Sequence, residues 1–114
     1  MKELIKVMKA LSDPVRVKMV KMLQRKVMCV CEIQAALNTS QSNASKHLKL
    51  LEEAGLITSS KEGLFVNYSL SDGLRSPYAA SLLGNMKHWL ESDPDIRSLV
   101  GRLPSISRED IRGR

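Results

Sequence analysis

Apolar residues recur along the first forty residues at the spacing of helical faces. The pattern predicts a first helix over 2–11, whose apolar stripe consists of Leu4, Ile5, Met8 and Leu11. Ser12-Asp13-Pro14 follows. Because Asp is a good N-cap and Pro suits the first helical position, a second helix is predicted from Pro14 to about Gln24. A short third helix is predicted over 30–37, before the polar sequence 38–40.

The clearest predicted helix covers 41–54. At about 100° per residue, its apolar residues and its short polar or basic residues separate onto opposite sides. The first group is Ala44, His47, Leu48, Leu51 and Ala54, and the second is Ser42, Ser45, Lys46 and Lys49. Gly55 then ends the helix where a left-handed residue is favoured. Two helices joined by a tight polar turn, the second with a polar and basic outer face, are typical of a helix-turn-helix.

After Gly55 the period changes from 3.6 to 2, which predicts strands over 56–60 and 64–71 with a turn at 61–63, a β-hairpin. A long helix is predicted over 76–92, with Leu82, Met86, Trp89 and Leu90 as its stripe, and a short one over 96–103. The fold class is therefore mostly α with a β-hairpin, a winged helix-turn-helix. We expect one domain over 1–103 and a frayed polar tail over 104–114.

Composition and charge narrow the function. The 114 residues are 43% hydrophobic and 26% charged, as in one folded, soluble domain. No apolar run approaches the about 20 residues of a membrane span, and the N-terminus has no signal core, so we expect a cytoplasmic protein. The net charge is +6, and residues 1–28 carry eight Lys and Arg against two acidic residues. This balance favours a polyanionic partner, while four aromatic residues argue against a stacking surface for single strands.

The outer face of the 41–54 helix has the side chains that reading double-stranded DNA requires. Gln41, Ser42 and Ser45 are short polar groups for base edges, and Lys46 and Lys49 are cations for phosphates. Lys61 is the cation of the hairpin turn. His47 lies toward the apolar side and is interpreted as a structural histidine. Two alternatives stay open: a merely solvated helix face, and a protein-interaction winged helix without DNA binding, which predicts no salt-dependent affinity for DNA.

Cys29 and Cys31 are the second candidate site. The short span strains a disulfide between them, so we expect none to form easily. At a helix start, where free N–H groups stabilise thiolates, both sulfurs can converge on one soft ion. Trivalent arsenic or antimony, or a soft divalent metal, fits such ligands. A thiol-oxidation switch and two cysteines that only pack beneath the second helix remain alternatives. Neither Cys-x-x-Cys nor a glycine-rich phosphate loop occurs, so we do not expect an enzyme.

Several short motifs together make the chain resemble one family. They are residues 10–16 (Ala-Leu-Ser-Asp-Pro-Val-Arg), 29–33 (Cys-Val-Cys-Glu-Ile), Gln41-Ser42, 45–51, 54–57, Gly63 and 68–70. Over about 4–90 the sequence resembles the ArsR/SmtB family of metal- and metalloid-responsive repressors, and Cys-Val-Cys resembles the arsenic-responsive branch. The resemblance implies a homodimer that pairs through its terminal helices, 4–11 and 78–90. It also implies binding to operator DNA and release when arsenic, antimony or a methylated arsenical binds Cys29 and Cys31.

The chain departs from the family pattern at three places. Gln34 stands where the arsenic-responsive pattern commonly has a third cysteine, so one subunit cannot supply three thiolates. The remaining options are a two-thiolate site completed by water or a small thiol, a methylated arsenical, or a site shared between subunits. Leu64 stands where the family often has a cation after the turn glycine, which puts a wing contact with DNA in doubt. The acidic and histidine ligands of the zinc-responsive branch are absent from the last helix.

Overall fold

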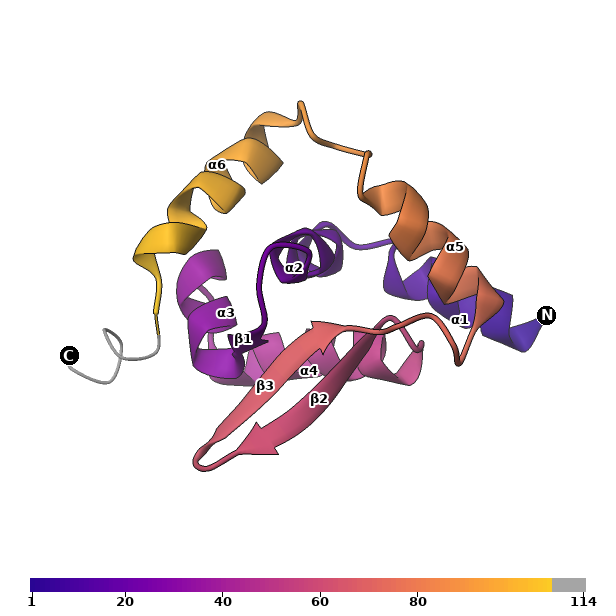
Figure 1. Ribbon diagram of the computed structural model, residues 1–114, viewed down its shortest axis with the longest axis horizontal. Coiled ribbons are helices and arrows are strands. Elements are labelled where there is room, and N and C mark those ends of the chain that lie inside the picture. The colour runs from indigo at the N-terminus through magenta and orange to yellow at the C-terminus, as the bar shows by residue number, and fades with distance from the viewer. Residues whose placement is uncertain (108–114) are drawn as a thin grey trace.

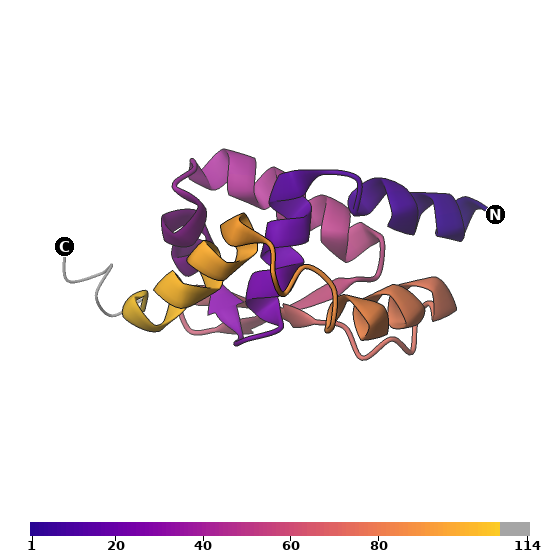
Figure 2. The same cartoon turned by 90° about the horizontal axis from the view of Figure 1, so that it is seen from above.

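Helix α2 (Pro14–Leu23) runs through the middle of the molecule, and the other elements pack around it (Figure 1). In Figure 2, α4 passes behind α2, α3 and α6 lie together toward one end of the molecule, and α1 and α5 lie together at the N-terminal end. This computed structural model describes residues 1–107. The remaining elements are α1 (Lys2–Ala10), β1 (Met28–Cys29), α3 (Val30–Leu37), α4 (Gln41–Glu53), β2 (Ile57–Glu62), β3 (Phe65–Leu70), α5 (Pro77–Met86), α6 (Pro94–Arg102) and the 3₁₀ helix η1 (Leu103–Ser105).

The beginning of α2 forms as its sequence predicts. Asp13 is extended, and its Oδ1 accepts hydrogen bonds from the backbone N–H groups of Val15 at 2.8 Å and Arg16 at 3.3 Å. Pro14 occupies the first helical position, where its missing N–H leaves no bond unmade. Met19, Val20 and Met22 are fully buried, so α2 supplies the centre of the core.

The turn of the hairpin is shorter than the period-2 pattern predicts, because the first strand extends to Glu62 instead of residue 60. Strands β2 and β3 pair in antiparallel register up to Glu62 and Phe65, which leaves only Gly63 and Leu64 in the turn. Gly63 has φ +59°, a conformation that suits glycine at the first position of a two-residue hairpin turn. Strand β1 pairs with the other edge of β3, Cys29 opposite Asn67, and this third strand was not predicted from the sequence.

Helix α5 ends at Met86, six residues before the predicted end of the long helix. A buried lysine explains the early stop. The Lys21 Nζ atom, on α2, donates to the carbonyl oxygens of Met86 and Trp89, both at 2.8 Å, and lies 3.3 Å from Glu91 Oε1. Leu90 then turns the chain with φ +64°. Trp89 and Leu90, expected in the apolar stripe, are 49% and 43% exposed.

The apolar stripe predicted for the first helix is not the side that the structure buries: Leu4 and Leu11 are half-buried, and Ile5 and Met8 are exposed. Val7 and Ala10 are the buried residues of α1, packed toward the core and α5. Ile5 is 43% exposed and Met8 is 52% exposed. An amphipathic helix that turns part of its apolar side to solvent has surface available for another chain.

The segment after the predicted domain boundary continues the fold for four residues. Pro104 and Ser105 belong to η1, and Ile106 packs against the core. Residues 108–114 of the predicted tail lie outside the described residues. Over 1–107, no helix is long and apolar enough to cross a membrane. The predicted fold class, mostly α with a β-hairpin in winged helix-turn-helix order, is confirmed.

Replacing Lys21 by Met tests the role of the buried ammonium. The alkyl chain is retained, but the carbonyls of Met86 and Trp89 lose their donor. Because a buried polar group left unpaired costs about 1–3 kcal/mol, we expect the free energy of unfolding to fall by about that amount or more in urea denaturation. Arg25→Met is the matched control, since Arg25 pairs with the same Glu91 on the surface. A loss no larger than the control's would contradict the capping role.

Candidate nucleic-acid interface and cysteine site

The turn between α3 and α4 is short and held by its own side chains. Asn38 ends α3 in the left-handed region with φ 52°. Ser40 caps α4, its Oγ accepting the N–H of Asn43 at 3.1 Å. The Asn43 side chain in turn donates to Thr39 Oγ1 at 2.8 Å. With three residues between the helices, the position of α4 depends directly on that of α3.

Helix α4 has a buried and an exposed side, as the sequence predicts. Ala44, Leu48 and Leu51 are completely buried, and burying each leucine contributes about 1.5–3 kcal/mol. The opposite side is exposed, and the structure brings five of the six predicted DNA-binding residues together there: Gln41, Ser42, Ser45, Lys46 and Lys49. Because the buried leucines fix the rotation of α4 about its axis, these five side chains share a fixed outward direction.

Lys61, the sixth predicted DNA-binding residue, lies on β2 rather than on α4. It is exposed, near the end of the hairpin, and Leu64 in the turn is 88% exposed. The wing thus presents an apolar tip with one neighbouring cation.

His47 and Arg16 connect α4 to the end of α1. The Arg16 Nη1 atom lies 3.0 Å from His47 Nδ1, and because arginine has only donors, the imidazole is the acceptor. The same guanidinium donates from Nε to the Ala10 carbonyl at 2.7 Å and from Nη2 to that of Lys9 at 3.2 Å. His47 therefore has the structural role expected of it, and Arg16 holds two helices together.

The other end of α4 is tied to the hairpin. Glu52 Oε2 accepts a hydrogen bond from Ser59 Oγ at 2.7 Å, across to β2. Burial, and secondarily the negative charge of Glu52, raises the pKa of the Tyr68 phenol on β3. Tyr68 therefore stays neutral at physiological pH, where it packs against the core.

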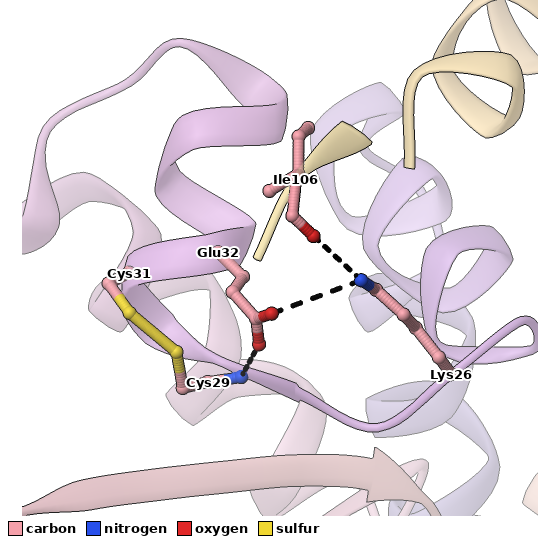
Figure 3. The surroundings of a disulfide bond; sticks show 5 residues. All are labelled: Lys26, Cys29, Cys31, Glu32 and Ile106. Carbon is pink, nitrogen blue, oxygen red and sulfur yellow. Dashed lines mark hydrogen bonds and ion pairs between the residues drawn. A yellow bond between two sulfur atoms is a disulfide. The ribbon is translucent and has the colours of Figure 1, made fainter. Parts of the chain in front are cut away.

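The structure joins Cys29 and Cys31 by a disulfide, contrary to the expectation that this spacing resists closure (Figure 3). The reason is the break in conformation between them. Cys29 is extended, with φ −82° and ψ 166°, and is the N-cap of α3, whereas Cys31 lies in the first helical turn. Their Cα atoms are 5.5 Å apart, inside the usual disulfide range of about 4.4–6.8 Å. Within one regular helix the two side chains would point in different directions.

The cysteine pair is partly shielded from solvent. Cys29 is 1% exposed, and Cys31 is of intermediate exposure. Within residues 1–107, no group of three or more His, Cys, Asp or Glu residues is arranged to hold a metal ion. One described subunit thus offers two sulfurs and no third side-chain ligand of these types.

Two residues beside the pair were not predicted. Glu32 is 8% exposed, and its Oε1 accepts the Cys29 N–H at 2.9 Å. Its position three residues after the N-cap is the capping-box signature that could have identified it. Lys26, whose Nζ lies 3.9 Å from Glu32 Oε2, has no such signal, because the contact depends on how the chain folds back.

A short capped turn, a helix with an outward polar and basic face, and a two-stranded wing define a winged helix-turn-helix of the DNA-binding class. Residues 13–59 match the family described as bacterial regulatory protein, arsR family. The arsenical resistance operon repressor of Escherichia coli is 33% identical over 87% of this chain and 83% of that protein. The chain belongs to the ArsR/SmtB family of transcriptional repressors.

One further relative in sequence and one solved structure are also similar to this chain. A cadmium resistance transcriptional regulatory protein CadC homolog of Staphylococcus aureus is 42% identical over 61% of this chain, which spans only 59% of that relative. HlyU of Vibrio cholerae has a similar solved structure, with TM-score 0.66 and 28% identity over 81% of this chain and 95% of that one; HlyU has also been solved in a form described as reduced.

Replacing Ser45 by Phe tests the outer face of α4. The position is exposed, so folding and the thermal unfolding temperature should be unchanged. On the expectation that this face of α4 enters a DNA groove, a bulky ring at position 45 should lower the preference for operator over random DNA by about 10- to 100-fold, the value of one good base contact. Fluorescence anisotropy with both DNAs measures the ratio. Ser98→Phe, on the exposed side of α6, is the control. An unchanged ratio for Ser45→Phe would remove this face from sequence recognition.

Proposed function

We propose that this protein is a homodimeric repressor that acts on operator DNA in the cytoplasm, with α4 of each subunit in the major groove. The support is the exposed face of α4, where Gln41, Ser42 and Ser45 reach base edges while Lys46 and Lys49 meet phosphates. Lys61 of the wing adds a further phosphate contact. In a two-fold dimer the two α4 helices address half-sites one DNA turn apart or a multiple of it, about 34–36 Å per turn.

The proposed inducer is trivalent arsenic or antimony, or a methylated arsenical, bound by Cys29 and Cys31. The observation that carries this proposal is that both sulfurs meet at the first turn of α3. With the pair reduced, arsenous acid forms two As–S bonds, the two thiol protons leave with two hydroxyl groups as two waters, and one hydroxyl remains on arsenic. Thiolates are the ligands that such soft centres prefer.

The names of two family relatives support this choice of inducer. The E. coli relative is an arsenical resistance repressor and the S. aureus relative a cadmium resistance regulator, so both take their names from thiophilic elements. Gln34 supplies no thiolate, and therefore the third position on arsenic belongs to water, a small thiol, a carbon substituent or the partner subunit.

Release from DNA follows from the position of the pair. A ligand that bridges Cys29 and Cys31 sets the geometry of the first turn of α3, and the eight-residue α3 leads through Asn38 to α4. If that geometry fits the DNA-bound shape poorly, the ligand favours the free dimer. Coupling free energies of this kind are typically about 1–3 kcal/mol, or 5- to 150-fold in DNA affinity.

A second candidate effector is oxidation of the same pair. The disulfide between Cys29 and Cys31 favours it, since it places the two sulfurs where a bond can form. Hydrogen peroxide would accept two electrons and two protons from the dithiol, giving the disulfide and two waters. HlyU, similar in structure, has been solved in a form described as reduced.

The dimer would use the apolar surface that α1 and α5 leave exposed. Ile5 and Met8 on α1 and Tyr78 on α5 are 43%, 52% and 38% exposed, and the two helices pack side by side. A hollow of about 900 Å³ opens beside them, lined in part by Ile5 and Leu50. A second copy of this surface would cover the apolar side chains across a two-fold axis.

The cysteine proposal is tested with Cys29→Ser/Cys31→Ser. Reduced wild-type protein bound to its operator should release it on addition of arsenite or antimonite, with affinity falling about 5- to 150-fold. The double variant should bind the operator as tightly as wild type and ignore both compounds, as gel shifts can show. Release of the double variant would place the effector site elsewhere.

A second experiment, on wild-type protein, separates the two candidate effectors. Hydrogen peroxide added without metalloid should release wild-type protein if oxidation is the signal, and dithiothreitol should restore binding. Release by arsenite in the presence of tris(2-carboxyethyl)phosphine, a reductant without thiols, but not by peroxide favours the metalloid. The reverse result favours the redox switch.

The dimer is tested with Met8→Asp. A charge on the exposed side of α1 should not disturb the core, but should convert the dimer to monomer in sedimentation velocity and weaken operator binding. Leu64→Asp, an equally large change on the exposed wing tip, is the control and should remain dimeric. A dimeric Met8→Asp variant would move the interface away from this face.

A further inference from the structure

A buried carboxylate connects the cysteine pair to a distant part of the chain (Figure 3). Glu32 has two oxygens with different partners. Oε1 accepts the backbone N–H of Cys29 at 2.9 Å, and Oε2 lies 3.9 Å from the ammonium of Lys26. The first contact is the usual companion of a helix N-cap. The contact with Lys26 is not needed to cap the helix, and it links Glu32 to a residue outside α3.

Lys26 continues the connection to residues that follow α6. Its Nζ donates to the Ile106 carbonyl at 2.8 Å and lies 3.5 Å from that of Leu103. Leu103 is 3% exposed and Ile106 packs against the core, so these carbonyls belong to a docked segment. The lysine side chain itself is 35% exposed and that of Glu32 is 11% exposed, which leaves the ion pair partly shielded from water.

Cys29 is held from two sides. Its backbone pairs with Asn67 of β3, and its N–H is bound by Glu32. Cys31, by contrast, lies within the first turn of α3, so its position is set by that helix. Whether the two sulfurs face each other therefore depends on the bend at Cys29, and that bend includes the hydrogen bond to Glu32.

We propose that Glu32 is a positioning residue of the effector site and that Lys26 couples this site to the docking of segment 103–106. This inference rests on the proposed role of Cys29 and Cys31 and names the contacts that regulate it. A ligand on both sulfurs restrains Cys29 and with it the Glu32 carboxylate, which then holds Lys26 against the carbonyls of Leu103 and Ile106. Because linkage is reciprocal, a firmly docked segment also favours ligand binding.

Phenylarsine oxide is a suitable probe, since it needs only two thiols. It forms two As–S bonds with the reduced pair and releases its oxygen, with the two thiol protons, as one water. The change in ultraviolet absorbance on formation of the As–S bonds reports binding to the reduced full-length chain. Outer contacts of a ligand site typically contribute 10- to 100-fold in affinity, so Lys26→Met and Glu32→Gln should each weaken binding about tenfold.

The variants are chosen to separate coupling from simple structural damage. Glu32→Gln keeps an acceptor for the Cys29 N–H but loses the charge that faces Lys26. Lys26→Arg retains the positive charge and should bind phenylarsine oxide with wild-type affinity. Arg25→Met loses an equal charge one residue away and should also leave this affinity unchanged. Lys26→Met and Glu32→Gln both break the Lys26–Glu32 ion pair. The double variant Lys26→Met/Glu32→Gln should therefore bind the probe no more weakly than either single variant.

Hydrogen exchange supplies a readout that a merely structural role would not move. In wild-type protein, phenylarsine oxide should slow amide exchange in peptides covering 103–107, far along the chain from the cysteines. In Lys26→Met the same peptides should exchange at a rate that the probe does not change, even where the overall unfolding temperature is slightly lower.

The outcomes distinguish this inference from the function on which it rests. If wild-type protein does not bind the probe, or binds it as well after Cys29→Ser/Cys31→Ser, the proposed effector site is wrong. If wild type binds through the cysteines but Lys26→Met and Glu32→Gln match it in affinity and exchange response, only the coupling is overturned.

Discussion

The first turn of α3 holds the cysteine pair, and a three-residue turn joins this helix to α4 with its exposed polar and basic face. Cys29 leaves strand β1, bends into the helix and is bound there by Glu32, so a two-residue cysteine motif is divided between extended and helical backbone. Without that bend the sulfurs would diverge. Without the short turn at 38–40, a change at α3 would not reach α4. Few residues form this bend and this turn, and each of the two is held by side-chain hydrogen bonds.

The remainder of the fold holds α4 in a defined orientation. Leucines on its inner side are buried, Arg16 binds His47 near its middle, and Glu52 ties its end to the hairpin. Three separate contacts thus restrain one helix. The proposed switch requires such restraint, because a loosely held α4 would absorb a local change at α3 instead of carrying it to the exposed side chains of α4.

Cations in the first quarter of the chain have more than one role. Their excess indicates a polyanionic partner, yet Arg16, Lys21 and Lys26 all bind carbonyls or neighbouring side chains of their own protein. Lys21 is fully buried and ends α5, which is a structural task with no direct contribution to an electrostatic surface. The net charge therefore overstates the basic surface that is available to a polyanionic partner, because these three cations already bind groups of their own chain.

Local patterning by itself determined the helices around α2, the two sides of α4, the hairpin and the position of Cys29 and Cys31 at a helix start, because periodicity, caps and turn residues act within a few residues of each other. Only the tertiary structure decided the early end of α5, the third strand, the closure of the cysteine pair and the contact between Lys26 and the chain after α6. The closure of the cysteine pair depends on the bend at Cys29, and the other three depend on groups far apart in sequence: Lys21 and Met86, Cys29 and Asn67, Lys26 and Ile106. Such partners leave no periodic signal, since the folded chain alone brings their atoms within bonding distance.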